Sequence, residues 1–214
     1  MDQPQRDCLR SGWLSLLSRF GVPATDAQAS FAELADAYTR ADRFYHNLDH
    51  IRAVLSTIDS LADLAGDLPA VQLAAWYHDV IYDSRARDNE ERSADLAAVR
   101  CLGWGVPAAT VGTVRRLILA TKSHHADAYD VDAHILLDVD LAILGADEEE
   151  YARYARAIRQ EYAWVTEDDY HRGRASVLHG FLGRARIFRL DRMHERLDAA
   201  ARRNLRNEIA VLGA

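Results

Sequence analysis

The stretch PAVQLAAWYHDV, residues 69–80, indicates most clearly how this chain folds. Its apolar residues run almost without interruption, and Pro69 is a residue that helices accept in their first turn. A run of this kind, without strand-like alternation, predicts a short helix from residue 70 to about 80 that is buried on most sides. His78 and Asp79 lie at its end. A carboxylate in such a setting is costly unless a cation or hydrogen bonds compensate it.

Apolar residues elsewhere in the chain also recur at helical spacing, and no convincing alternating strand pattern appears. The sequence therefore predicts an all-α protein with a bundle of roughly 8–10 helices. The further helices are expected over residues 13–20, 25–39, 47–64, 89–102, 107–121, 131–144, 148–165, 168–186 and 193–212. No repeat, low-complexity tract or linker divides the chain, so residues 1–214 are predicted to form a single domain.

The composition and charge of the chain exclude several classes of function. Of the 214 residues, 49% are hydrophobic and 28% charged, which is ordinary for a globular protein. The formal charge of −7 argues against an extended nucleic-acid surface. Only two cysteines are present, which excludes a cysteine-rich metal site and makes a disulfide framework unlikely. No signal-peptide pattern or run of about 18 apolar residues occurs, so we expect a cytoplasmic protein without a membrane partner.

Two histidines lie four residues apart in RFYHNLDH, residues 43–50. If the helix has already begun there, His46 and His50 lie one turn apart on one face and could share a metal ion. This pair alone is a weak signal, because histidines at this spacing are more often solvated or hydrogen-bonded than metal ligands.

A third segment, LLDVDLAILG at residues 136–145, places Asp138 and Asp140 inside an otherwise aliphatic helix. One buried acid can be an accident. Three apolar helices that each carry His or Asp where the core should be are hard to explain without a shared ligand. Neutral imidazoles together with carboxylates suit a hard or borderline divalent cation, and such a cation can activate water against a phosphate ester.

With these residues in this order, the chain resembles the HD superfamily of metal-dependent phosphohydrolases, which is named for its His-Asp doublet. The resemblance runs from about residue 43 to 145, the predicted metal-site core, with the N- and C-terminal helices packed on it. It assigns metal ligation to His50, His78, Asp79 and Asp140, with Asp138 as the alternative to Asp140. Longer strings, among them LDVDLAILG, also look like a bacterial subgroup of uncharacterised predicted HD hydrolases.

The resemblance implies an enzyme, a metal-dependent hydrolase that acts on a nucleotide or another small phosphate ester with a metal-activated water as nucleophile. It implies one divalent ion per chain, or two, drawn from Mn, Mg, Fe, Zn, Ni and Co. Two alternatives stay open: a di-iron HD-type oxygenase, and a non-catalytic nucleotide-binding HD protein. The expected partner is a small-molecule phosphate, and a homo-oligomer is also left open.

The segment TKSHH, residues 121–125, contains the chain's only lysine. Lys122 is a candidate phosphate clamp, and His124 is a candidate proton donor or extra ligand, with His125 the weaker of the two histidines. The alternative is a polar loop that merely follows a helix. Both readings have equal weight.

Further candidates flank the predicted ligands. Arg43, His46 and Asn47 are predicted to bind substrate, since a guanidinium matches phosphate with two parallel hydrogen bonds. Asp83 and Glu91 are candidate catalytic groups that orient the attacking water. Glu91 has an alternative role that we favour from sequence, as the last member of a capping box in DNEE, residues 88–91.

Overall fold

The computed structural model describes residues 1–213, and over that range the protein is all-α, as predicted. The chain divides into two compact units, Met1–Leu136 and the residues from Leu137 onward. Ten α-helices are present in the described range, and none of them is long and apolar enough to cross a membrane.

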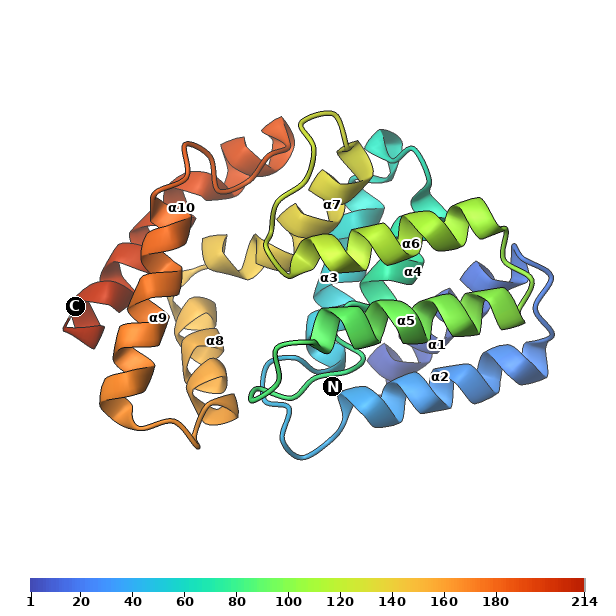
Figure 1. Ribbon diagram of the computed structural model, residues 1–214, viewed down its shortest axis with the longest axis horizontal. Helices are drawn as coiled ribbons and strands as arrows, with labels where there is room; N and C mark the ends of the chain where they lie inside the picture. Colours follow the sequence, from blue (N-terminus) through green and yellow to red (C-terminus); the bar gives the residue numbers. More distant parts are fainter. Residues whose placement is uncertain (214) are drawn as a thin grey trace. The chain divides into compact units, whose positions relative to one another are not determined.

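The first unit is built from six helices and the beginning of a seventh (Figure 1). They are α1 (Gln3–Ser18), α2 (Ala24–Tyr38), α3 (Leu48–Ser60), α4 (Leu68–Tyr77), α5 (Asn89–Gly103), α6 (Ala108–Thr121) and the first residues of α7 (Val131–Asp140).

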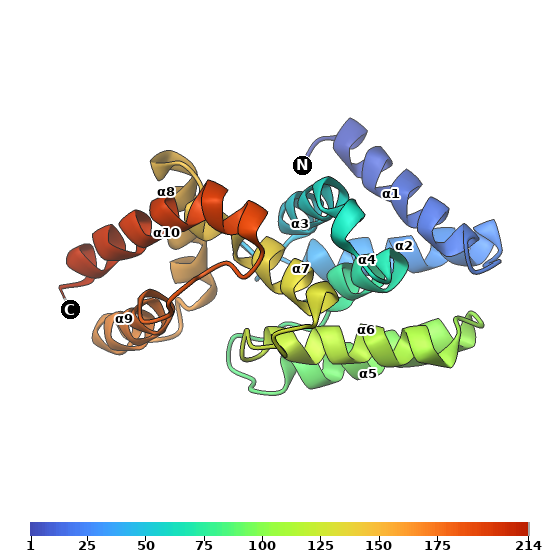
Figure 2. The same ribbon diagram turned by 90° about the horizontal axis from the view of Figure 1, so that it is seen from above.

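Helix α4 is the centre of this unit, as the apolar stretch predicts. It packs against α3 on one side and against the α5–α6 pair on the other, an arrangement visible in Figures 1 and 2. Trp76 near its end is 2% exposed and meets the buried ring of Trp13 edge to face at a centroid distance of 5.3 Å. The hydroxyl of Tyr38, at the end of α2, donates to the Trp76 carbonyl at 2.8 Å.

Side chains fix where α4 begins. The carboxylate of Asp67 accepts the Ala70 N–H at 3.1 Å and caps the helix. The carboxylate of Asp132 accepts the N–H groups of Gly66 and Asp67 at 2.7 and 3.0 Å. Because Asp132 lies in the first turn of α7, these bonds tie the start of α7 to the start of α4.

Two of the predicted helices are each divided into an α-helix and a 3₁₀ helix in the structure. Helix α3 ends at Ser60, and a separate 3₁₀ turn, Ala62–Leu64, carries the last apolar residues of the predicted 47–64 segment. Helix α7 ends at Asp140, and the remainder of the predicted 131–144 helix is the 3₁₀ helix η2, Leu141–Gly145. Apolar spacing cannot separate an α-helix from a 3₁₀ turn that buries the same residues.

The second unit contains the end of α7, η2, α8 (Glu148–Glu161), α9 (Glu167–Leu182) and α10 (Asp191–Leu212). Helix α10 packs along η2 and α9. A Cβ at Gly145 would lie 2.6 Å from the Cβ of Leu197, so this close approach of η2 to α10 requires glycine. The Asn204 amide then donates to the carbonyls of Leu144 and Ala146 at 2.9 Å each.

Candidate metal centre

The first ligand candidate, His50, is positioned by the N-terminus of α3. Asn47 is the N-cap residue, and its Oδ1 accepts the N–H groups of Asp49 and His50 at 2.8 and 3.4 Å. Its Nδ2 donates to the Phe44 carbonyl at 2.9 Å. The Asn47 amide therefore shapes the backbone around His50, whereas the sequence predicted that it binds substrate.

The second ligand candidate, His78, caps the C-terminus of α4. Its Nδ1 lies 2.9 Å from the Ala75 carbonyl oxygen. Since a carbonyl only accepts, Nδ1 must carry the proton and donate it, so Nε2 is unprotonated when the ring is neutral. A backbone bond of this kind is how proteins hold a metal-binding imidazole in one tautomer and one orientation.

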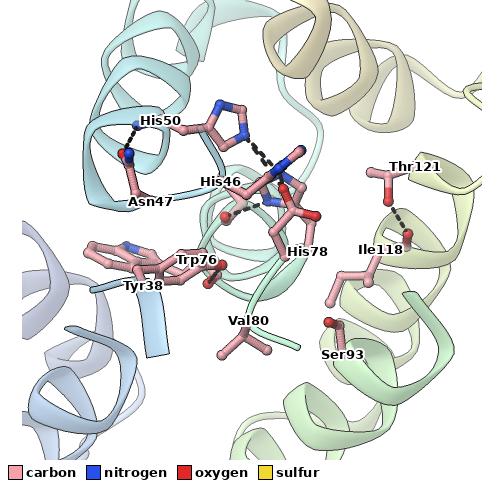
Figure 3. Close-up of polar contacts among 12 residues, drawn as sticks. Tyr38, His46, Asn47, His50, Trp76, His78, Val80, Ser93, Ile118 and Thr121 are labelled. Atoms are coloured by element: carbon pink, nitrogen blue, oxygen red, sulfur yellow. Dashed lines mark hydrogen bonds and ion pairs between the residues drawn. The ribbon is translucent and has the colours of Figure 1, made fainter. Parts of the chain in front are cut away.

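The two imidazoles and the following carboxylate converge, with the histidines visible together in Figure 3. The Nε2 atoms of His50 and His78 lie 3.2 Å apart. One Asp79 carboxylate oxygen lies 3.1 Å from the Nε2 of His78 and 3.8 Å from that of His50. The histidine side chains are only 3% and 2% exposed, whereas that of Asp79 is 20% exposed. The two imidazoles are therefore shielded from solvent, and the Asp79 carboxylate is the most accessible of the three groups.

Asp140 joins this group. One ligand atom from each of His50, His78, Asp79 and Asp140 lies within 4.8 Å of all the others, and no other such cluster occurs in residues 1–213. Asp140 is the last residue of α7, a continuous helix whose first residues belong to the unit that holds the other three.

Asp138 is used differently. Its two carboxylate oxygens accept the N–H groups of Arg189 and Leu190 at 2.8 Å each. The side chain is buried, and burial raises the pKa of Asp138 to about 6 against the opposing effect of these two hydrogen bonds. The geometry therefore favours Asp140 over Asp138 as the fourth ligand.

The spacing of these atoms fits a small divalent cation. Nitrogen and oxygen ligands lie about 2.0–2.2 Å from such an ion, so neighbouring ligands in an octahedral shell lie about 3 Å apart. The separations of 3.1 and 3.2 Å match that value, and the 3.8 Å between Asp79 and the Nε2 of His50 is longer. Two imidazoles and two carboxylates suit Mn, Fe, Zn, Ni, Co or Mg. The four residues can therefore hold a divalent ion.

Arg43 is buried, and its guanidinium binds backbone carbonyls next to the ligand candidates. Its Nη1 donates to the carbonyls of His46 and Asp79 at 3.0 and 2.6 Å, and its Nη2 donates to the Val80 carbonyl at 2.8 Å. The guanidinium lies over the ring of Tyr38 at 4.9 Å. The side chain that the sequence predicts to bind phosphate is thus occupied by the backbone of the site.

His46 precedes α3, so it is not one helical turn below His50. Its ring stacks on that of Tyr82 at a centroid distance of 4.3 Å. It lies 6.0 Å from the ring of His50, and both histidines are drawn in Figure 3. Tyr45 packs closer, 4.9 Å from the His50 ring. Sequence reasoning missed Tyr45 and Tyr82 beside these histidines, because an aromatic residue in a loop carries no periodic signal.

Lys122 contacts the carboxylate of Glu91, and its Nζ also donates to the Arg87 carbonyl at 2.6 Å. The hydrogen bond between Lys122 and Glu91 lowers the pKa of Glu91 and raises the pKa of Lys122. Asp88 is the N-cap of α5 but makes no side-chain capping bond, so the capping box favoured from sequence is absent. Glu91 is paired with Lys122 instead, since both groups lie on the facing ends of α5 and α6.

Two predicted catalytic residues lie in loops. His124 is half-buried beyond α6 and has a left-handed backbone, with φ of 50°, while its N–H donates to the Ala120 carbonyl. Asp83 is exposed, and its carboxylate accepts the Arg85 N–H at 2.9 Å. The backbone of Asp83 is held on both sides by the Asn89 amide. Its observed contacts therefore organise the loop.

No known family model, no curated protein and no solved structure matches the chain.

Proposed function

We propose that this chain is a metal-dependent phosphohydrolase of the HD type, which acts on a nucleotide or another small phosphate ester. The observation that supports it is the convergence of two imidazole Nε2 atoms, 3.2 Å apart, with the carboxylates of Asp79 and Asp140. A bound divalent ion supplies Lewis acidity, which makes a water nucleophilic at neutral pH and offsets the charge of a phosphate.

The protein's own residues contribute orientation. The bond from His78 Nδ1 to the Ala75 carbonyl fixes the tautomer in which Nε2 can donate its lone pair. Burial of both imidazoles limits competing water on the ligand side, and the more exposed Asp79 marks the side that a substrate can reach.

Lys122 is the group in this unit best suited to meet a phosphate. Its pKa is raised by the hydrogen bond to Glu91, so the amine stays charged, and its side chain is 42% exposed. A phosphate oxygen would compete with the Glu91 carboxylate for the same ammonium. His124, two residues further on, is the candidate proton donor.

The deciding experiment combines metal analysis of the purified protein with a screen of nucleotides and sugar phosphates for phosphate release. The matched variants are His78→Ala and His125→Ala, because His125 is an exposed histidine outside the ligand group. We expect His78→Ala to lose both metal and turnover and His125→Ala to keep both.

Other outcomes would replace this proposal. Full metal content in His78→Ala would reject the ligand assignment. Two irons per chain after anaerobic purification, with a coupled mixed-valence signal, would favour an oxygenase. Tight nucleotide binding without turnover under any metal would favour a non-catalytic nucleotide-binding protein.

A further inference from the structure

Arg43 connects the two chain segments that carry the metal-ligand candidates of the first unit. One segment contains His46 and leads into α3, and the other contains Asp79 and Val80 after the end of α4. The guanidinium donates to a carbonyl in the first and to two carbonyls in the second, over distances of 2.6–3.0 Å. No helix hydrogen bond does this, because both segments lie outside the helices.

The surroundings of Arg43 leave it little freedom to do anything else. The residue is 6% exposed, and its guanidinium lies 4.9 Å from the Tyr38 ring centre and 5.5 Å from that of Tyr82. The Nε atom is buried and has no hydrogen-bond partner. A phosphate oxygen could reach this guanidinium only if the carbonyl bonds were given up, which leaves buried carbonyls unsatisfied at a cost.

From these contacts we infer that Arg43 is a positioning residue for the metal centre: it sets the distance between His50 and the His78–Asp79 pair by binding the backbone on both sides. The inference rests on the proposed function only as far as metal binding. It replaces the substrate-binding role predicted for Arg43 from sequence.

A planar guanidinium is suited to bonding the carbonyls of two chain segments at the same time. It presents several N–H donors in a rigid fork, so one side chain can bond three carbonyls that point at it from different residues. A lysine keeps the charge but concentrates it in one flexible ammonium group. Lysine at position 43 would therefore retain the electrostatic attraction to Asp79 while the spacing of the two segments relaxes.

The test uses the full chain stripped of metal and measures Mn²⁺ affinity by titration calorimetry, with Co²⁺ absorption as a report on ligand geometry. For Arg43→Lys we expect Mn²⁺ affinity to fall about 10- to 100-fold, the range seen when groups that orient metal ligands are lost. The Co²⁺ spectrum should change as well. The control is Arg40→Lys, because Arg40 is exposed and its guanidinium forms an ion pair with Asp42 at 2.9 Å.

A second variant keeps the inference testable if Arg43→Lys does not fold. Tyr82→Leu removes one of the two rings beside the guanidinium at a half-buried position, and Tyr129→Leu is its control at a residue 93% exposed. We expect a several-fold loss of Mn²⁺ affinity in Tyr82→Leu alone.

Unchanged Mn²⁺ affinity and an unchanged Co²⁺ spectrum in Arg43→Lys would overturn the positioning role, and a selective loss of inorganic phosphate binding would restore the substrate contact. If Arg43→Lys does not fold, unchanged affinity in Tyr82→Leu overturns it equally. A parent chain that binds neither Mn²⁺ nor Co²⁺ would overturn both the proposed function and this inference. A parent chain that binds both ions, together with variants that bind them equally well, would overturn this inference alone.

Discussion

The Nε2 atoms of His50 and His78 lie 3.2 Å apart although 28 positions separate the two residues in the chain. The second ring already donates its Nδ1 proton to Ala75, so a neutral His78 presents a lone pair to His50. Two lone pairs at this distance repel unless a proton or a cation lies between them. The pairing, buried beside the Asp79 carboxylate, is therefore a place where a cation gains binding energy.

Metal binding should stabilise the fold. A ligand at 100 times its dissociation constant adds about 2.7 kcal/mol to the free energy of unfolding, provided that it binds only the folded chain. For a chain of this size we expect Mn²⁺ to raise the melting temperature by about 5–10 °C. Circular dichroism melts with Mn²⁺ and with EDTA measure the shift. An equal shift in His78→Ala would place the binding elsewhere.

Asp138→Asn and Asp140→Asn should separate stability from metal binding. Asp140→Asn should weaken Mn²⁺ affinity at least about 100-fold with little change in the melting temperature, because it removes a charged ligand atom. Asp138→Asn leaves one of the Arg189 and Leu190 N–H groups without an acceptor. It should lower the free energy of unfolding by about 1–3 kcal/mol while Mn²⁺ still binds. The reverse pattern would make Asp138 the ligand.

Lys122→Gln should reduce phosphate ester turnover without reducing metal content. Loss of a cation that meets the phosphate should lower kcat/KM at least about 10-fold, as with other groups that stabilise transition-state charge. Kinetics with p-nitrophenyl phosphate and metal analysis of the same samples check this. Arg92→Gln is the control, since Arg92 is an exposed cation 3.9 Å from Asp88. Equal rates in Lys122→Gln and the parent chain would remove Lys122 from the mechanism.

The second unit should be acid-sensitive through Asp198. Burial tends to raise the pKa of Asp198, but hydrogen bonds from Arg202 and the Ile187 N–H outweigh it and hold the pKa below its usual range. A depressed pKa in the folded state stabilises the protein above about pH 4, and this contribution is lost as the pH falls through the folded-state value.

Asp198→Asn should therefore cost about 2 kcal/mol at pH 7, the typical value for a hydrogen bond to a charged group. Urea unfolding of both proteins at pH 7 and pH 3 should show the difference shrinking at the lower pH. A difference that stays constant between the two values would mean that the Asp198 charge contributes nothing.

The sequence by itself determined the helical class and the central helix. Apolar spacing reports which faces are buried, and the run at residues 69–80 left no polar face for solvent. The same local signal pointed to the ligand candidates, because His78, Asp79 and Asp140 interrupt apolar segments where a charge needs compensation.

The tertiary structure decided what each neighbouring polar group does. Lys122 pairs with Glu91 from another helix, and Arg43 bonds carbonyls 36 and 37 positions away. Asp138 is buried and accepts the N–H groups of Arg189 and Leu190, whereas Asp140 is half-buried and belongs to the ligand group. Sequence periodicity predicts which residues of a helix are buried. The donors and acceptors that meet a polar side chain come from distant segments, and those partners exist only once the helices have packed.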